Sequence, residues 1–468
     1  MSREALADLH LAVPGGVATG DSVLDLHARD ESPYPPVRPW AVVTARTTGD
    51  VVAALQVCHR HRIPVVPFGA GSSLEAHVLP VHGGVSLDLS TMTRVISLRP
   101  HDLTVEVEAG VHRVALNEQL GAHGLFFPVD PGADATLGGM AATSASGTTT
   151  VRYGGMRENV LAVRAVTIDG RVVRSARATR KNSAGYDLTR LLIGSEGTLA
   201  VITELTLKIH GIPERMAAAV CAFPTLVDAV AAATAVVRSG IAIARCELLD
   251  PMAVRMANAH SGLALTEEHT LFFEFHGSET GVAGDIEQTR EVVIEFGGRE
   301  FQWAATETER RRLWRARHEL YFAGLAWRPG HRILSTDSAV PLSALPAAVE
   351  SARSIMSATG LEFSILGHVA DGNFHCLVLV DPASSDELGR ARRAAADLNH
   401  RVQDLGGTCT GEHGIGQGKI SALEDEAGPE AIDMMLAIKN AFDPLHLLNP
   451  GKVLRATVPV GPDVARES

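Results

Sequence analysis

Paired cysteines are missing from this chain, and their absence excludes several kinds of site. The five cysteines are scattered with no CxxC pair, so neither a disulfide framework nor an iron-sulfur cluster is expected. There is also no basic stripe, and the formal net charge is -12, which argues against nucleic acid or an anionic membrane surface as a main partner. A reducing compartment is the simplest expectation.

Long apolar runs are absent as well. No stretch reaches the about 18 apolar residues of a membrane-spanning helix, and the apolar run at residues 229–237 is too short to cross a bilayer. The N-terminal residues carry early acidic side chains and no long apolar segment, unlike a secretory signal or an arginine-rich transit peptide. We therefore expect a cytoplasmic protein with no transmembrane segment, at most peripheral to a membrane through a partner.

What is present is the composition of a soluble globular protein, with 46% hydrophobic and 21% charged residues. A chain of 468 residues is too long for one ordinary core, so two or three domains are expected. The proline-rich end of residues 1–40 predicts an extended lead-in. Residues 41–68 predict a strand, an amphipathic helix and a second strand, which together form a βαβ unit.

A glycine-rich turn follows at residues 69–73. Such a loop brings backbone N–H groups against a pyrophosphate, although a plain tight turn has the same composition. It lacks the third glycine of the dinucleotide-binding fingerprint, where Leu74 stands, and the GK[ST] ending of a P-loop. Residues 126–147 are rich in Gly, Ala, Ser and Thr, which permits close approach of the backbone to a large flat ligand.

Periodicity and turn residues predict several further elements. Residues 160–175 predict a hairpin centred on Asp169 and Gly170, and residues 191–209 predict a glycine-interrupted strand pair. Later segments predict helices at residues 225–240, 310–326 and 431–442 and a strand at residues 270–279.

Two histidines flank a second predicted turn. In HVADGNFH, Asp371 and Gly372 favour a two-residue hairpin that would place His368 directly opposite His375, with Cβ atoms about 5 Å apart. Glu412 stands beside His413 between glycines and offers a carboxylate as a third ligand. Two imidazoles and a carboxylate suit a divalent ion such as zinc or manganese and leave a position for a substrate. The alternative is that these are ordinary members of the chain's 20 histidines.

Seven blocks, in one order, carry a family resemblance: PFGAGSS, FFPVDPGADATLGGMAATSASGTTTVRYG, GSEGTLAVIT, LWRARHELYFA, GHVADGNFH, TGEHGIG and NPGK. Together they resemble the FAD-dependent D-lactate dehydrogenases of the cytochrome-linked type. These belong to the vanillyl-alcohol oxidase flavoprotein superfamily, near the glycolate oxidase flavin subunit and D-2-hydroxyglutarate dehydrogenase. The resemblance covers residues 40–452.

The resemblance implies an α+β fold, with a two-part FAD-binding domain of the vanillyl-alcohol oxidase type and an α+β cap domain that contains an antiparallel sheet. The expected divisions are an FAD-binding domain at residues 1–212, a cap that holds substrate and metal at residues 213–404, and a C-terminal segment at residues 405–468 that packs back on the FAD domain.

The cofactor-binding residues follow from the same resemblance. They are Gly69, Ala70, Gly71, Ser72, Ser73, Pro131, Thr136, Gly138, Gly139, Thr143, Ser144, Gly147, Glu196, Gly197, Ile202 and Asn449. Relatives that bind the flavin covalently place a histidine in the first loop. Here Ser72 and Ser73 stand there, so FAD is expected to be non-covalent.

The resemblance also assigns roles in the cap. His368, His375 and Glu412 would hold a zinc, manganese or iron ion, His413 would be the general base, and Arg317 would bind the substrate carboxylate. Without the resemblance, Arg317 would be interpreted as a solvated arginine on a charged helix.

The implied reaction is the oxidation of a short D-2-hydroxy acid, with D-lactate to pyruvate as the leading case. Hydride would pass to flavin N5 and electrons to an external cytochrome, quinone or flavoprotein. The alternatives are a glycolate oxidase flavin subunit, another D-2-hydroxyacid dehydrogenase, and a non-catalytic electron-relay flavoprotein. Ser335 stands where relatives acting on hydroxyglutarate carry a lysine, which favours a monocarboxylic substrate.

Overall fold

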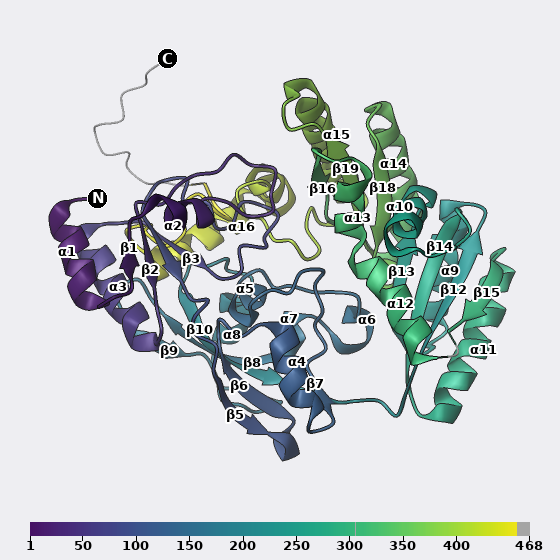
Figure 1. Cartoon of the computed structure of the whole chain (residues 1–468), viewed down its shortest axis with the longest axis horizontal. Helices are drawn as coiled ribbons and strands as arrows, with labels where there is room; N and C mark the ends of the chain where they lie inside the picture. The colour runs from purple at the N-terminus through teal and green to yellow at the C-terminus, as the bar shows by residue number, and fades with distance from the viewer. Residues whose placement is uncertain (305, 456–468) are drawn as a thin grey trace.

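The computed structural model describes residues 1–304 and 306–455, which form two lobes (Figure 1). The first lobe has an apolar core built from residues between Ala5 and Ile209 together with Leu447 and Leu448 from near the end of the described chain. The second lobe is a large sheet with a separate apolar core on each face. The molecule therefore folds around one core in the first lobe and around two in the second.

The first sheet of the first lobe has the strand order β1-β2-β4-β3, with β2 and β3 both parallel to β4. Its strands are β1 (Val17–Ala18), β2 (Ala41–Thr44), β3 (Val65–Phe68) and β4 (Val85–Asp88). Helix α3 (Thr48–His61) connects β2 to β3 and begins at a capping box formed by Thr47 and Asp50. The predicted βαβ unit is confirmed, and the glycine-rich turn follows directly after β3.

The expectation of an extended lead-in at residues 1–40 is wrong. Helix α1 (Arg3–Ala12) begins at Ser2, whose side chain accepts a hydrogen bond from the backbone N–H of Ala5, and it packs against α3. Strand β1 then pairs with β2, and a short helix α2 (Asp21–Leu26) follows. Prolines are concentrated only at the end of this segment, so they do not prevent a helix before them.

The second sheet of the first lobe is antiparallel with the order β5-β6-β10-β8-β9. Its strands are β5 (Val95–Arg99), β6 (Thr104–Glu108), β8 (Val160–Val166), β9 (Val172–Arg174) and β10 (Val201–Lys208). The hairpin predicted around Asp169 and Gly170 is confirmed, since Val166 pairs with Val172. The strand pair predicted at residues 191–209 is wrong, because helix α8 (Leu188–Leu192) and a turn precede the single strand β10.

Short elements complete this lobe. They are η1 (Pro100–Asp102), α4 (Arg113–Gly121), β7 (Leu125–Phe126), α5 (Leu137–Ala142), α6 (Thr150–Tyr153), α7 (Met156–Asn159) and β11 (His210–Gly211).

The second lobe contains an eight-stranded antiparallel sheet of order β15-β12-β14-β13-β18-β19-β16, in which β17 also pairs with β19. Its strands are β12 (Arg215–Phe223), β13 (Ile243–Leu249), β14 (His269–Gly277), β15 (Arg299–Trp303), β16 (Arg332–Ser335), β17 (Ser338–Ala339), β18 (Phe363–Gly367) and β19 (Asn373–Val380). The expected antiparallel cap sheet is confirmed.

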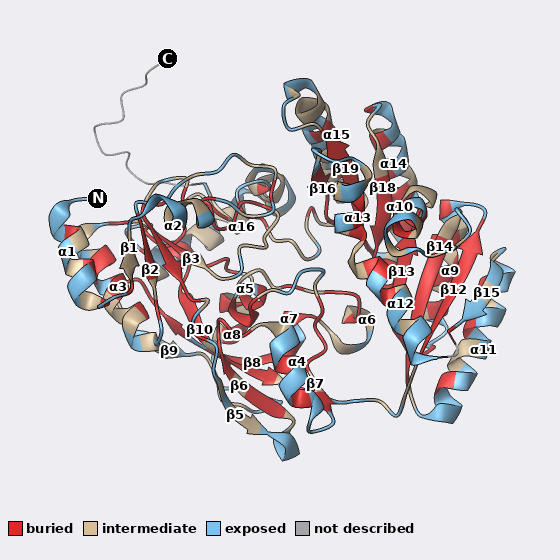
Figure 2. Cartoon of the chain, viewed as in Figure 1, coloured by how far each residue is buried: buried red, intermediate tan, exposed pale blue. Residues whose placement is uncertain are grey.

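Both faces of this sheet are buried, as the red strands of Figure 2 show. Along β14, Leu271, Phe273 and Phe275 enter the core of one face, and Phe272 between them enters the core of the other. The covering helices are α9 (Leu226–Arg238), α10 (Pro251–Ser261), α11 (Glu279–Glu295), α12 (Glu307–His318), α13 (Leu320–Trp327), α14 (Leu345–Ala358) and α15 (Ser385–Asp404), with a short turn η2 (Leu342–Ala344) before α14. The predicted strand at residues 270–279 and helix at residues 225–240 are confirmed.

The single helix predicted at residues 310–326 is two helices. Helix α12 ends at His318 and α13 begins at Leu320, with Glu319 as the residue between them. Arg317 is on the last turn of α12, and its side chain is buried.

The C-terminal segment returns to the first lobe. Helix α16 (Ile420–Phe442) is interrupted at Gly428 and Pro429, and Lys439 near its end donates a hydrogen bond to the carbonyl of Thr198. Asn449 N donates to the carbonyl of Val65. We therefore propose the divisions expected from the sequence, at residues 212 and 404. Residues 456–468 of the expected C-terminal segment lie outside the described residues.

Candidate active site

One cavity of about 400 Å³ brings the predicted cofactor, metal and substrate residues together. From the first lobe and the C-terminal segment it is lined by Gly69, Ala70, Gly71, Ser72, Ser73, Pro131, Thr136, Gly138, Gly139, Thr143, Glu196, Gly197, Ile202 and Asn449. From the second lobe and the loop after α15 it is lined by Arg317, His368, His375, Glu412 and His413. Residues far apart in the chain therefore face one space.

Two predicted cofactor residues do not line this cavity. Ser144 follows α5 in the left-handed conformation, and Gly147 packs so closely on the backbone of Asp130 that a β-carbon there would clash. Gly147 thus permits contact between two parts of the chain itself, which is a use of glycine that composition does not distinguish from ligand contact.

The wall formed by the first lobe fits an extended cofactor. A β-carbon at Gly69 would clash with Thr136 Oγ1, so the glycine lets the loop after β3 lie against the start of α5. Buried polar atoms on lining residues, His77 Nδ1 and Asn449 Oδ1, have no hydrogen-bond partner among the described residues. A bound molecule with donors and acceptors would satisfy such atoms.

The two predicted metal-binding histidines lie close together, although the predicted hairpin register is wrong. His375 on β19 pairs with Leu366 of β18 and not with His368. The connection is a 3₁₀ turn, η3 (Val369–Asp371), followed by Gly372 in the left-handed conformation, so only one turn residue has a positive φ where a type I′ turn needs two. The imidazole centroids are nevertheless 5.6 Å apart.

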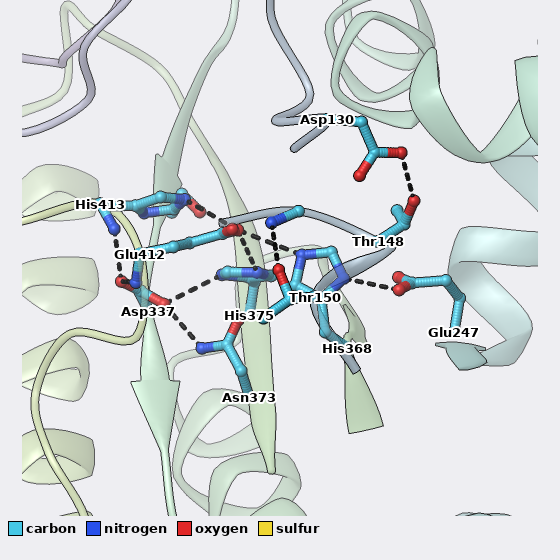
Figure 3. A network of polar contacts seen from close by, with 12 residues as sticks. Asp130, Thr148, Thr150, Glu247, Asp337, His368, Asn373, His375, Glu412 and His413 are labelled. Atoms are coloured by element: carbon cyan, nitrogen blue, oxygen red, sulfur yellow. Dashed lines mark hydrogen bonds and ion pairs between the residues drawn. The ribbon is translucent and has the colours of Figure 1, made fainter. Parts of the chain in front are cut away.

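Glu412 completes a set of three possible ligands (Figure 3). Its Oε1 lies 3.2 Å from His368 Nε2 and 3.2 Å from His375 Nε2. Neighbouring ligands around an ion with bonds of about 2 Å are spaced in this way, so the donor set fits zinc or a similar divalent ion. Burial opposes both charges, yet the carboxylates of Glu247 and Glu412 hold the pKa of His368 well above its usual value, and His368 and His375 hold the pKa of Glu412 well below its own.

The loop that carries Glu412 is held from both lobes. Asp337 Oδ2, in the second lobe, accepts hydrogen bonds from the backbone N–H groups of Glu412 and His413, each at 2.8 Å. Glu196, in the first lobe, accepts from the backbone N–H groups of Ile415 and Gly416, each at 2.7 Å. The position of the third ligand therefore depends on one carboxylate from each side.

Asp337 itself is not a good ligand, although Asp337, His375 and His413 also come close together. Its Oδ2 accepts from Thr410 Oγ1 as well, and its Oδ1 accepts from Asn373 Nδ2. His375 Nδ1, the nitrogen on this side, lies 3.1 Å from the carbonyl of Thr336. These groups are already used, so this second arrangement is a support for the loop.

His413 and Arg317 flank the three possible ligands. The His413 ring stacks on His375 at 5.0 Å, and its Nε2 lies 3.9 Å from Glu412 Oε1. Burial lowers the pKa of His413 to about 4, against the opposing pull of Asp337, so its imidazole is neutral at physiological pH and able to accept a proton. The guanidinium of Arg317 contacts Glu247 and the residue is only 8% exposed, so it is not the solvated helix arginine that would be inferred without the family resemblance.

The two carboxylates that support the candidate ligands, Asp337 and Glu247, were not predicted. Each is a fully buried carboxylate, and each was overlooked because no turn or motif surrounds it. A usable indication existed for Glu247, which interrupts the apolar run between Cys246 and Leu248, because a charged residue within a buried strand needs partners.

Two family models match this chain. Residues 39–176 match one described as FAD binding domain, and residues 212–453 match one described as FAD linked oxidases, C-terminal domain. The chain belongs to the FAD-linked oxidases. Membership of the FAD-linked oxidases supports FAD as the cofactor.

The curated relatives of this FAD-linked oxidase include D-lactate dehydrogenases. It is 45% identical over 445 residues to a probable mitochondrial D-lactate dehydrogenase from Danio rerio, covering 94% of this chain and 90% of that one. It is 42% identical over 416 residues to the mitochondrial D-lactate dehydrogenase (cytochrome) from Arabidopsis thaliana, covering 89% and 73%. Both relatives are named mitochondrial, so the cytoplasmic location stays a prediction.

Solved structures support the fold of this FAD-linked oxidase. The 4-ethylphenol oxidase from Gulosibacter chungangensis superposes with a TM-score of 0.79 at 17% identity, covering 98% of both chains. Among the helices that the structure describes, none combines the length and apolar character needed to cross a bilayer.

Proposed function

We propose that this FAD-linked oxidase oxidises a short D-2-hydroxy acid, with D-lactate to pyruvate as the leading reaction, and passes the electrons to an external acceptor. The observation that carries the proposal is the shared cavity. It places three possible metal ligands, a neutral imidazole and a buried arginine beside the loop expected to hold FAD. The names of the curated relatives agree with this reaction.

Each residue has a task in that reaction. When bound, FAD supplies a two-electron acceptor, and a zinc, manganese or iron ion held by His368, His375 and Glu412 supplies a Lewis acid. Arg317 binds the substrate carboxylate through Nη1. Its Nε and Nη2 contact Glu247, whereas Nη1 has no such contact and is left for the substrate. His413 accepts the hydroxyl proton at Nε2, the nitrogen nearest to Glu412.

The substrate end of the cavity favours a small monocarboxylate. Ser335 lines it, and a serine offers no cation to a second carboxylate. Leu366 and Leu377 provide apolar lining nearby, which suits an alkyl group. A cytochrome, a quinone or another flavoprotein would take the electrons, and a purely electron-relaying protein would have no use for this assembled base and ligand set.

Anaerobic addition of substrate tests the proposal. D-lactate is expected to bleach the oxidised flavin band at about 450 nm, and L-lactate is not, because the carboxylate and hydroxyl positions fix which face of the carbon meets the flavin. The absorbance is recorded with short D- and L-hydroxy acids, before and after treatment with a chelator, and the chelated protein is expected to lose the response.

The other outcomes separate the alternatives. Faster bleaching by glycolate than by D-lactate would favour the glycolate oxidase flavin subunit. Failure of every short hydroxy acid to bleach a fully loaded protein would favour the electron relay.

The flavin is expected to be released intact on denaturation, because Ser72 and Ser73 occupy the loop positions where covalent relatives carry a histidine. Acid precipitation should leave the yellow colour in the supernatant, measured by its absorbance. Colour that stays with the pellet would point instead to His77, the histidine that lines the cavity beside this loop.

A further inference from the structure

Glu247 is a buried charge to which the proposed chemistry gives no task. It is on β13 in the middle of the second lobe's sheet, paired with Phe272 of β14, and its side chain is fully buried. A carboxylate at such a position is costly unless it is paired, so its partners indicate why it is there.

Those partners belong to two different parts of the site. Oε1 of Glu247 lies 2.5 Å from Nδ1 of His368 (Figure 3). Oε2 accepts from Arg317 Nε at 2.9 Å and lies 2.6 Å from Arg317 Nη2. One carboxylate therefore joins a possible metal ligand to the arginine proposed to bind the substrate.

We propose that Glu247 is a positioning residue that couples ion binding at His368 to substrate binding at Arg317. The inference rests on the proposed function, because it needs both the ion and a carboxylate substrate. It assigns to Glu247 no contact with either.

The contact with His368 prepares that ring for an ion. When an ion is bound, a carboxylate at Nδ1 keeps the proton on that nitrogen and leaves the Nε2 lone pair for the ion, on the side where Glu412 Oε1 lies 3.2 Å away. It also fixes the plane of the ring and raises its basicity as a ligand. Loss of such a partner from a metal-binding histidine weakens metal affinity by about ten- to a hundred-fold.

The contact with Arg317 orients its guanidinium for the substrate. Nε and Nη2 both meet one oxygen of Glu247, which fixes the guanidinium plane and leaves Nη1 for a substrate oxygen. An ion that orders His368 thereby orders Glu247 and Arg317 as well. A bound ion therefore tightens the binding of a substrate anion at Arg317. By linkage, the substrate anion tightens ion binding by the same factor.

The variant Glu247→Gln tests the contacts of the carboxylate with His368 and Arg317 while keeping the packing of the side chain. The amide has nearly the same shape but only one acceptor oxygen, so it cannot accept from His368 and Arg317 together, and its NH₂ group faces a donor. We expect metal affinity to fall about ten- to a hundred-fold. At saturating metal we expect KM for D-lactate to stay raised, with a smaller change in kcat.

The first measurement does not depend on turnover. The dissociation constant for Mn²⁺ or Zn²⁺ is determined on FAD-loaded protein without substrate, by competition with a chromogenic chelator. Steady-state kinetics at saturating metal then give KM and kcat separately. Glu108→Gln is the matched control, because Glu108 is also a buried strand glutamate paired with an arginine, Arg94 at 2.7 Å, but is not among the residues that line the cavity.

The outcomes are distinct. Weaker metal binding and a raised KM in Glu247→Gln, with Glu108→Gln like the wild type, support the coupling. Metal affinity in Glu247→Gln equal to that of the wild type would overturn it. If Glu247→Gln does not fold, Glu247→Asp carries the same test, since its shorter carboxylate cannot reach both partners. A wild-type protein that binds no divalent ion would instead overturn the proposed function.

Discussion

Replacing His368 by alanine is expected to lower the rate of flavin reduction by D-lactate at least about a thousand-fold while FAD stays bound. His368 supplies Nε2 to the three-ligand set, and a Lewis acid at a developing alkoxide contributes several kcal/mol, where each about 1.4 kcal/mol is tenfold in rate. The glycine-rich loop expected to hold FAD lies in the other lobe, so flavin content should not change. Rapid mixing gives the rate, and elemental analysis gives the metal content.

His269→Ala is the control for this variant. His269 is half-buried at the start of β14, in the same sheet, but does not line the cavity. Its loss should change neither the rate nor the metal content. If His368→Ala reduced its flavin at the wild-type rate, the ion would have no part in the reaction. If it lost FAD, the placement of the second lobe over the cofactor would be wrong.

His413→Gln is expected to lower the rate of flavin reduction by about a hundred- to ten-thousand-fold, the usual contribution of a general base. Metal content should be retained, because Glu412 is positioned through backbone N–H groups that the substitution leaves in place. The measurement is the limiting rate constant of anaerobic reduction at saturating D-lactate, together with metal content.

A fall in metal content equal to that of His368→Ala would show that His413 acts as a ligand rather than as the base. An unchanged rate with normal metal content would show that another group accepts the proton.

The sequence predicted that His368 and His375 lie close together, but for a partly wrong reason. The Asp371-Gly372 pair indicates a turn, and a turn does bring His368 and His375 together. The register differs because the chain closes through η3, so His375 pairs with Leu366. Proximity of two side chains tolerates such a shift when both residues are at the same end of a tight reversal, whereas the exact pairing does not.

The supporting carboxylates could not be predicted in the same way. Glu247 is 121 residues from His368, and Asp337 is 75 residues from Glu412. Local periodicity does not predict contacts over such separations. The first depends on the pairing of β13 with β18, and the second on the return of the loop after α15 to β17. The N-terminal helix was missed for a local reason, because prolines that follow β1 and α2 do not constrain the residues before them.

The loop at residues 411–416 has a consequence for rebuilding this enzyme. Asp337 accepts a hydrogen bond from one end of the loop and Glu196 from the other. Its conformation therefore depends on both lobes. Consider a chimera in which only the second lobe comes from another oxidase. The residue at position 337 would then come from that oxidase, while the loop that it holds would come from this protein. Substrate range is therefore transferable between such proteins only if the lobe, this loop and its two anchoring acids are exchanged as one unit.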